Sequence, residues 1–110
     1  MRTIVAITLL LLAARREPTA AIALKGFGVH PDTLTVVAGT RITFTNEDDI
    51  AHTVTAGVPD HPDGRFMSAL PAKGATFAVT LTKPGTYPFF CERHPFMHGE
   101  IHVTSPESKP

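Results

Sequence analysis

The sequence contains a single cysteine, Cys91, so an internal disulfide bond is impossible and a disulfide-stapled secreted scaffold is excluded. Ten basic and ten acidic residues balance to a formal net charge of zero, which leaves no basic face of the kind that nucleic acid requires. No window shows helical periodicity over a useful length, and no internal repeat is present. We therefore expect neither a nucleic-acid-binding protein nor a helical one.

The composition is that of one folded domain. A chain of 110 residues leaves no room for a second domain, and a hydrophobic content of 43% is enough to bury a core. Eight glycines and ten prolines indicate many turns and short elements.

The N-terminus has the pattern of a targeting segment. An apolar run over residues 4–14 follows the basic Arg2 and has the length of the hydrophobic region of a signal peptide, too short for a membrane-spanning helix. An Ala-x-Ala-like cleavage site follows at residues 21–23 or a little earlier. The charged residues 15–17 lie between the two and are unfavourable for cleavage, so an uncleaved N-terminal anchor is the alternative.

These features divide the chain into three parts. We expect residues 1–23 to be a signal peptide or N-terminal membrane anchor, residues 24–105 to be the folded domain, and residues 106–110 to be a flexible tail. The protein is then expected to be periplasmic or otherwise exported, or tethered to the membrane where the first segment is retained.

Alternation of apolar and polar residues predicts short strands in the rest of the chain. Within residues 41–46, Ile42 and Phe44 share one face while Thr43 and Thr45 share the other. Several short strands with regular turn signals favour an all-β fold, an antiparallel sandwich. The remaining predicted strands are residues 33–37, 52–56, 76–81, 85–91 and 100–104, with a loop over residues 59–64.

Three potential metal ligands lie close together near the C-terminus. Cys91, His94 and Met97 follow one another at intervals of three residues, and thiolate, imidazole and thioether form the soft ligand set that suits copper. Pro95 stiffens this loop. A further ligand should come from another strand, and His52, at the start of a predicted strand, is the best candidate.

Each of these residues has an ordinary structural explanation when taken alone. Cys91 fits a buried core thiol, His52 a surface histidine and Met97 a packing residue. The combination favours a metal site. The acidic run over residues 47–49 is interpreted as a solvated loop.

The residues around this loop resemble the cupredoxins, the type 1 blue-copper proteins. The loop over residues 91–97 resembles their copper loop, and its short spacing is most similar to that of the amicyanins rather than the plastocyanins. Residues 83–87 resemble the turn into the ligand strand, and Asn46 followed by residues 52–54 resembles the family's Asn…His segment. The resemblance extends from about residue 20 to residue 104.

The resemblance implies a cupredoxin-like Greek-key β-sandwich that holds one type 1 copper ion. It implies that His52, Cys91 and His94 bind copper in a roughly trigonal arrangement, with Met97 as a long, weak axial ligand. The metal would keep Cys91 deprotonated.

Two residues are expected next to the ligands, Asn46 and Thr53. Many relatives have asparagine where this chain has Thr53, and the backbone N–H at that position is expected to donate to the cysteine sulfur. Asn46 fits a structural turn residue better than a residue that tunes the metal directly. The sequence also has no tryptophan where some relatives have one, and Phe44 lies in the matching strand.

The implied function is outer-sphere electron transfer, not catalysis, because four protein ligands leave no open position for a substrate. The edge of His94 is the expected exit, framed by Pro95 and Phe96 with a contribution from Met67. We expect a monomer with a small docking surface. The expected partners are redox proteins, namely an exported or membrane dehydrogenase, a cytochrome or an oxidase.

Two other functions compete with electron transfer. A copper carrier or store would deliver metal rather than electrons, but such proteins usually have more open, methionine-rich sites, and beyond the N-terminal segment this chain has only Met67 and Met97. An enzyme would need an open coordination position or a second copper-type ligand cluster, and no such cluster is evident. Zinc in the site would represent misloading.

Overall fold

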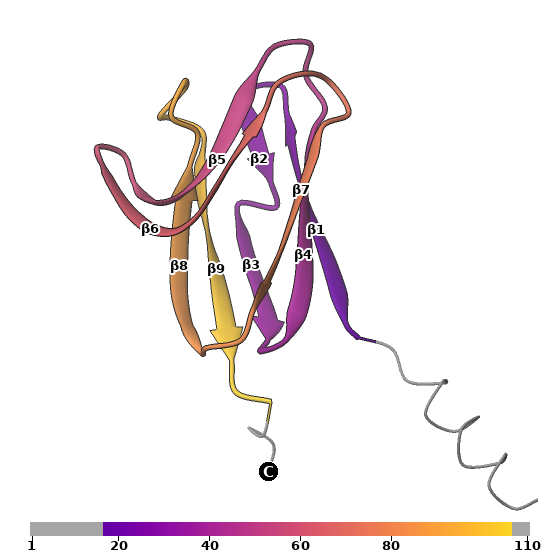
Figure 1. The fold of residues 1–110 in the computed structure, drawn as a ribbon, viewed down its shortest axis with the longest axis vertical. Helices are drawn as coiled ribbons and strands as arrows, with labels where there is room; N and C mark the ends of the chain where they lie inside the picture. Colours follow the sequence, from indigo (N-terminus) through magenta and orange to yellow (C-terminus); the bar gives the residue numbers. More distant parts are fainter. Residues whose placement is uncertain (1–16, 107–110) are drawn as a thin grey trace, which may run out of the picture.

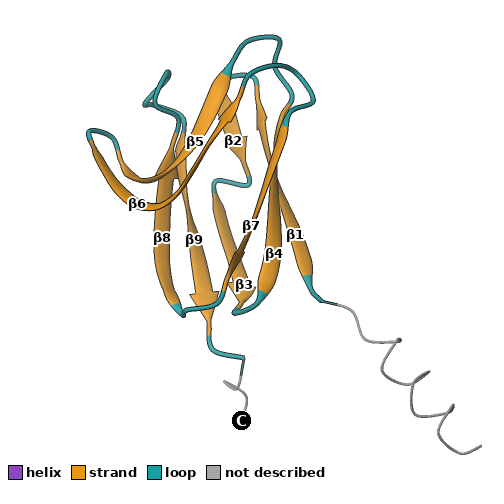
Figure 2. Cartoon of the chain, viewed as in Figure 1, coloured by secondary structure: helices purple, strands orange, loops and turns teal. Residues whose placement is uncertain are grey.

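The computed structural model describes residues 17–106, which form two β-sheets packed face to face (Figure 1). Figure 2 shows strands joined by turns and loops throughout this range, with no helix. These residues therefore provide no helix that could cross a membrane. The strands are β1 (Thr19–Lys25), β2 (Gly28–His30), β3 (Thr33–Val37), β4 (Thr40–Asn46), β5 (His52–Val58), β6 (His61–Leu70), β7 (Thr76–Leu81), β8 (Gly85–Phe90) and β9 (His98–Thr104).

The sheet order explains which strands run parallel. One sheet has the order β2-β1-β4-β7 and the other β3-β9-β8-β5-β6. The chain leaves the β1–β2 hairpin for the opposite sheet at β3 and returns at β4, so β4 runs in the same direction as β1. β3 and β9 are also parallel. The predicted all-β sandwich is confirmed, whereas two of its strand pairs are parallel rather than antiparallel.

A cluster of aromatic rings joins the two sheets. Phe44 of β4 is fully buried, as the predicted alternation requires. Its ring centroid lies 5.3 Å from that of Phe89 in the other sheet, in an edge-to-face arrangement. It lies 6.0 Å from the ring of Phe77 and 6.3 Å from that of Phe66. Such aromatic pairs add to the stability gained from burying apolar area, and their preferred geometry fixes the position of one sheet relative to the other.

Strands β5 and β6 form a long hairpin where the sequence predicted a loop over residues 59–64. Only Pro59 and Asp60 separate the two strands, and the hairpin bends away from the sandwich (Figure 1). The prediction is wrong from His61 onward because β6 is an edge strand, paired only with β5, and an edge strand tolerates a residue such as Pro62.

The folded domain begins before residue 24, where the sequence analysis placed its start. β1 starts at Thr19 and pairs in parallel with β4 from that residue onward, and Ile22 is only 1% exposed. The Ala-x-Ala site at residues 21–23 lies inside this strand, so cleavage there would remove part of the core. Small residues suit both a cleavage site and a packed strand, which explains the misplaced boundary. Residues 1–16 and 107–110 lie outside the described range, so the targeting segment and tail remain predictions.

The corrected boundary predicts the effect of a substitution at Ile22. We expect Ile22→Ala to lower the free energy of unfolding by about 2–5 kcal/mol, because it leaves a cavity between β1 and the core. Urea unfolding of the metal-free protein measures this change. Ala21→Ser, at an exposed neighbour, is the control and should change stability by less than about 0.5 kcal/mol. A domain that began at residue 24 would give equal, negligible effects for both variants.

Candidate metal centre

Two loops at one end of the sandwich bring together three of the predicted ligands. His52 starts β5, Cys91 directly follows β8, and His94 lies in the turn between β8 and β9. Their candidate ligand atoms all lie within 4.8 Å of one another. The Cys91 sulfur is 3.8 Å from Nδ1 of His52 and 3.8 Å from Nδ1 of His94. Both imidazoles therefore present the same ring nitrogen to the sulfur.

Backbone hydrogen bonds coil the β8–β9 loop around the cluster. The His94 N–H donates to the Cys91 carbonyl at 3.3 Å, and the Met97 N–H donates to the His94 carbonyl at 2.8 Å. The Cys91 N–H in turn donates to the Met97 carbonyl at 3.0 Å and closes the loop. The three-residue spacing thus becomes a closed turn in which Met97 is 1% exposed. Axial ligation by Met97 remains a prediction.

The cluster is almost entirely removed from water. His52 and Cys91 are 1% and 2% exposed, and only His94 is half-buried. A buried thiolate without a compensating charge is costly, so these donors fit a bound cation. Two imidazoles and a thiolate, with a thioether in the same loop, match the donor set of one type 1 copper ion.

Thr53 ties the two ligand loops together. Its backbone N–H donates to the Cys91 sulfur at 3.4 Å, which is the contact expected from the sequence. Its hydroxyl also accepts a hydrogen bond from the Glu92 N–H at 2.8 Å. A threonine in place of the asparagine of many relatives therefore still links the start of β5 to the loop that carries Cys91.

Asn46 supports the loop that leads to His52 rather than the cluster itself. It is fully buried at the end of β4, and its side-chain amide donates to the carbonyls of Ile50 and Leu70 at 2.8 and 3.0 Å. Its side-chain oxygen accepts a hydrogen bond from the Asp48 N–H at 2.8 Å. This arrangement agrees with the interpretation of Asn46 as a structural turn residue.

Asp48 contacts a candidate ligand directly, although its sequence pattern did not predict a role at the site. Asp48 Oδ2 lies 2.9 Å from Nε2 of His52, and the Gly26 N–H donates to Oδ1 at 2.7 Å. The hydrogen bond with His52 is the main reason that the pKa of Asp48 lies below its ordinary value. The interpretation of the acidic run as a solvated loop is therefore wrong at Asp48, whose side chain is 15% exposed. The only sequence signal for this contact was the four-residue spacing between Asp48 and His52.

A second missed residue, Phe27, comes from the β1–β2 turn. Its backbone has a φ of 60°, and its ring centroid lies 5.3 Å from that of His94 and 6.1 Å from that of His52. Phe27 is 47% exposed and Phe96 is 66% exposed, with their ring centroids 6.4 Å apart. The half-buried edge of His94 is therefore flanked by exposed aromatic rings. The only signal in the sequence was an aromatic residue between two glycines.

The other predicted docking residues differ in position. Pro95 is exposed in the loop between His94 and Phe96. Met67 is 64% exposed but lies in β6, opposite Thr55 of β5. The docking role of all these residues remains a prediction.

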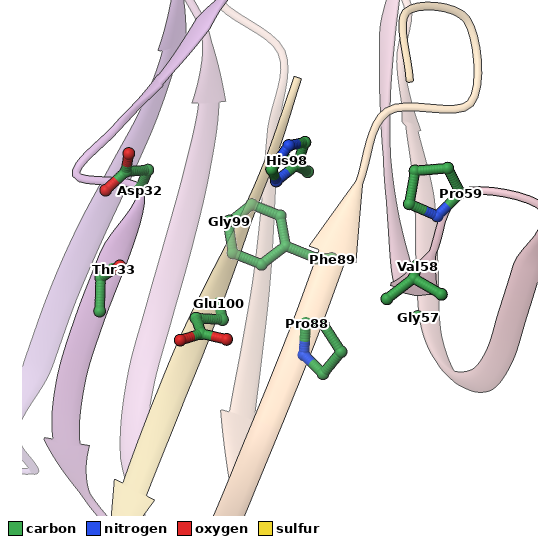
Figure 3. A pocket seen from close by; sticks show the side chains of 10 residues that line it. All are labelled: Asp32, Thr33, Gly57, Val58, Pro59, Pro88, Phe89, His98, Gly99 and Glu100. Carbon is green, nitrogen blue, oxygen red and sulfur yellow. The ribbon is translucent and has the colours of Figure 1, made fainter. Parts of the chain in front are cut away.

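The pocket in Figure 3 is separate from the cluster. It has a volume of about 410 Å³ and is lined on one side by Pro59 of the β5–β6 turn and on the other by Pro88 and Glu100 of strands β8 and β9. None of the four predicted ligands lines it. This pocket therefore does not contribute to the proposed metal centre.

The fold and the cluster together define a β-sandwich with a copper-type site, and this chain belongs to the cupredoxin family. The cupredoxin-like domain matches residues 2–103. Plastocyanin A/B from Petroselinum crispum is 36% identical over 86 residues, which cover 71% of this chain and 89% of that protein. Chloroplastic plastocyanin from Oryza sativa subsp. indica is 43% identical over 71 residues, covering 59% of this chain and 46% of that protein. The chain thus spans about half the length of that relative.

A solved structure shows the same architecture. The reduced Cu(I) form of an amicyanin variant has a TM-score of 0.64 and is 26% identical, covering 83% of this chain and 87% of that chain. The resemblance to the cupredoxins that the sequence indicated is confirmed.

The Thr53 hydroxyl provides a test of how the two loops are linked. We expect Thr53→Val to lower the free energy of unfolding of the metal-free protein by about 0.5–1.5 kcal/mol, because the Glu92 N–H loses its acceptor. Hydrogen exchange at the Glu92 amide should become faster. Thr53→Ser keeps the hydroxyl and should behave like the wild type in both measurements. Slow Glu92 exchange in the valine variant would show that this bond does not hold the loops together.

Proposed function

We propose that this protein is a small exported blue-copper electron carrier that holds one type 1 copper ion through His52, Cys91, His94 and Met97. The observation that carries the proposal is the buried His-Cys-His cluster, with Met97 buried in the same closed loop. Copper in such a site supplies a one-electron Cu(I)/Cu(II) couple.

The proposed ligand set favours electron transfer over catalysis. Four protein donors leave no position at which a substrate could bind the metal, so electrons would pass by an outer-sphere route. The hydrogen bond that the Thr53 N–H donates to Cys91, the one that its hydroxyl accepts from Glu92, and those within the β8–β9 loop hold the donors in place. They would limit rearrangement when the charge of the metal changes. His94 is the one predicted donor that is not fully buried, and its ring therefore offers the exit.

The proposed docking surface is the aromatic patch around His94, formed by Phe27, Pro95 and Phe96. The proposed partners are redox proteins, such as an exported or membrane dehydrogenase, a cytochrome or an oxidase. Short-lived redox complexes use small interfaces, which suits a patch formed by a few loop residues. We propose that the carrier acts as a monomer, with Met67 at the margin of the contact.

The proposed location is the periplasm or another exported compartment. The apolar run over residues 4–14 supports export, and a retained N-terminal segment would tether the domain to a membrane. The described chain enters β1 at the end of the sandwich opposite the ligand loops (Figure 1). A tether at Thr19 would therefore leave the ligand end of the sandwich facing away from the attachment point.

The visible spectrum of the protein loaded with Cu(II) tests this function. We expect an intense thiolate-to-copper absorption that disappears on reduction and returns on oxidation. Cys91→Ser should abolish the absorption, because the serine hydroxyl provides no thiolate. His61→Gln, at an exposed histidine in β6, is the matched control and should leave the spectrum unchanged. A weakly absorbing wild type would favour copper delivery or storage instead.

Electron self-exchange between copies of the protein tests the docking surface. We expect Phe96→Asp to slow self-exchange at least about tenfold without changing the visible spectrum, because each encounter would place two like charges against each other. Nuclear magnetic resonance line broadening in mixtures of the oxidised and reduced protein measures the rate.

Val37→Asp provides the control for that measurement. Val37 is 44% exposed at the end of β3 and pairs with Thr104, at the far end of the sandwich from the ligand loops. Equal slowing by both variants would show that net charge, rather than the patch, controls the encounter.

A further inference from the structure

Asp48 is held from several sides beside the proposed copper site. Its side chain is 15% exposed in the loop between β4 and β5. Oδ1 accepts a hydrogen bond from the Gly26 N–H at 2.7 Å, and Oδ2 accepts one from the Phe27 N–H at 3.3 Å. The same Oδ2 lies 2.9 Å from Nε2 of His52, and the Asp48 N–H donates to Asn46. The carboxylate is therefore held in place by groups of the protein itself.

This contact determines which nitrogen of His52 can bind a metal. An ionised carboxylate only accepts hydrogen bonds, so Nε2 of His52 must be the donor. In a neutral imidazole the lone pair then lies on Nδ1. Nδ1 is the nitrogen 3.8 Å from the Cys91 sulfur. The protein thus selects both the tautomer and the orientation of the ring that copper requires.

We propose that Asp48 is a positioning residue that lowers the reduction potential of the copper site through its hydrogen bond with His52. This inference rests on the proposed function. A carboxylate behind a ligating histidine raises the basicity of the imidazole and fixes its orientation. A better donor and a nearby negative charge both stabilise Cu(II) more than Cu(I), because Cu(II) carries the greater positive charge.

Asp48 also affects the surroundings of His94, indirectly, through the β1–β2 turn. By accepting hydrogen bonds from Gly26 and Phe27, the carboxylate fixes the β1–β2 turn. The ring of Phe27 then lies edge-on to His94, 5.3 Å between centroids. Asp48 therefore contacts one histidine directly and positions the aromatic ring that flanks the other.

The charge of Asp48 is tested by the copper-loaded Asp48→Asn variant, which keeps an oxygen acceptor but removes the charge. We expect the ratio of Cu(II) to Cu(I) affinity to fall about tenfold, which corresponds to a rise in midpoint potential of about 59 mV. Asp48→Ala should in addition lower the Cu(II) affinity about 10–100-fold. Asp49→Asn removes the same charge from an exposed neighbour and should leave the potential close to that of the wild type. An equal rise in both asparagine variants would overturn the proposal.

A measurement on the metal-free protein tests the positioning itself. Nitrogen-15 spectra of the histidine rings should show His52 with its proton on Nε2 in the wild type and a mixture of tautomers in Asp48→Ala. A single Nε2–H tautomer in both would overturn the positioning role.

The visible spectrum of the wild type and the potential of Asp48→Asn together distinguish a failure of this inference from a failure of the proposed function. A wild type that is blue and reversibly reduced, with an unchanged potential in Asp48→Asn, would overturn the role of Asp48 and leave the electron carrier intact. A wild type without the blue absorption would overturn the electron carrier, whatever the tautomer of His52.

Discussion

The burial of the Cys91 sulfur is the constraint on which the rest of the ligand end depends. The residue is 2% exposed, and its sulfur receives one backbone hydrogen bond, from Thr53 at 3.4 Å. A single amide is poor compensation for a thiolate removed from water. A thiolate at this position would therefore need a cation beside it, and the loops hold both imidazole nitrogens next to the sulfur. The closed turn between β8 and β9 and the link from Thr53 to Glu92 maintain this arrangement.

The loops can do this because they are anchored in both sheets. The β8–β9 loop belongs to the five-stranded sheet, whereas the loop that leads to His52 comes from β4 in the four-stranded sheet. His52 and Cys91 lie at the ends of neighbouring strands, β5 and β8, of the five-stranded sheet. Sliding of one sheet over the other would instead move the segment that carries Asn46 and Asp48 relative to His52. The edge-to-face contact between Phe44 and Phe89 across the sandwich opposes such sliding, because closely packed side chains in a protein interior leave no space into which the sheets could shift. The core therefore contributes to the precision of the site as well as to stability.

The sequence predicted the features whose signals are local. Residues 91–97 hold three donors within one turn, and the alternation in β4 marked its buried face. The contacts of Asp48 with the β1–β2 turn join residues more than twenty positions apart, and no periodicity reports such a contact. The start of the domain was misplaced for another reason, because the alanines at residues 20, 21 and 23 are equally compatible with a cleavage site and with a strand. Alternation likewise identifies a strand without identifying its partner, so the parallel pairs were not predicted.

The two histidines of the cluster have opposite surroundings, and this asymmetry separates two tasks in the proposed carrier. His52 is fully buried against the carboxylate of Asp48, where a fixed charge would act on the proposed metal. His94 is half-buried between the rings of Phe27 and Phe96, where an uncharged surface can meet a partner. A charge beside His94 would affect docking and potential together. Asp48 nevertheless links the two sides, because its carboxylate contacts His52 and also holds the β1–β2 turn that carries Phe27, so a substitution at residue 48 would affect both the potential and the docking surface.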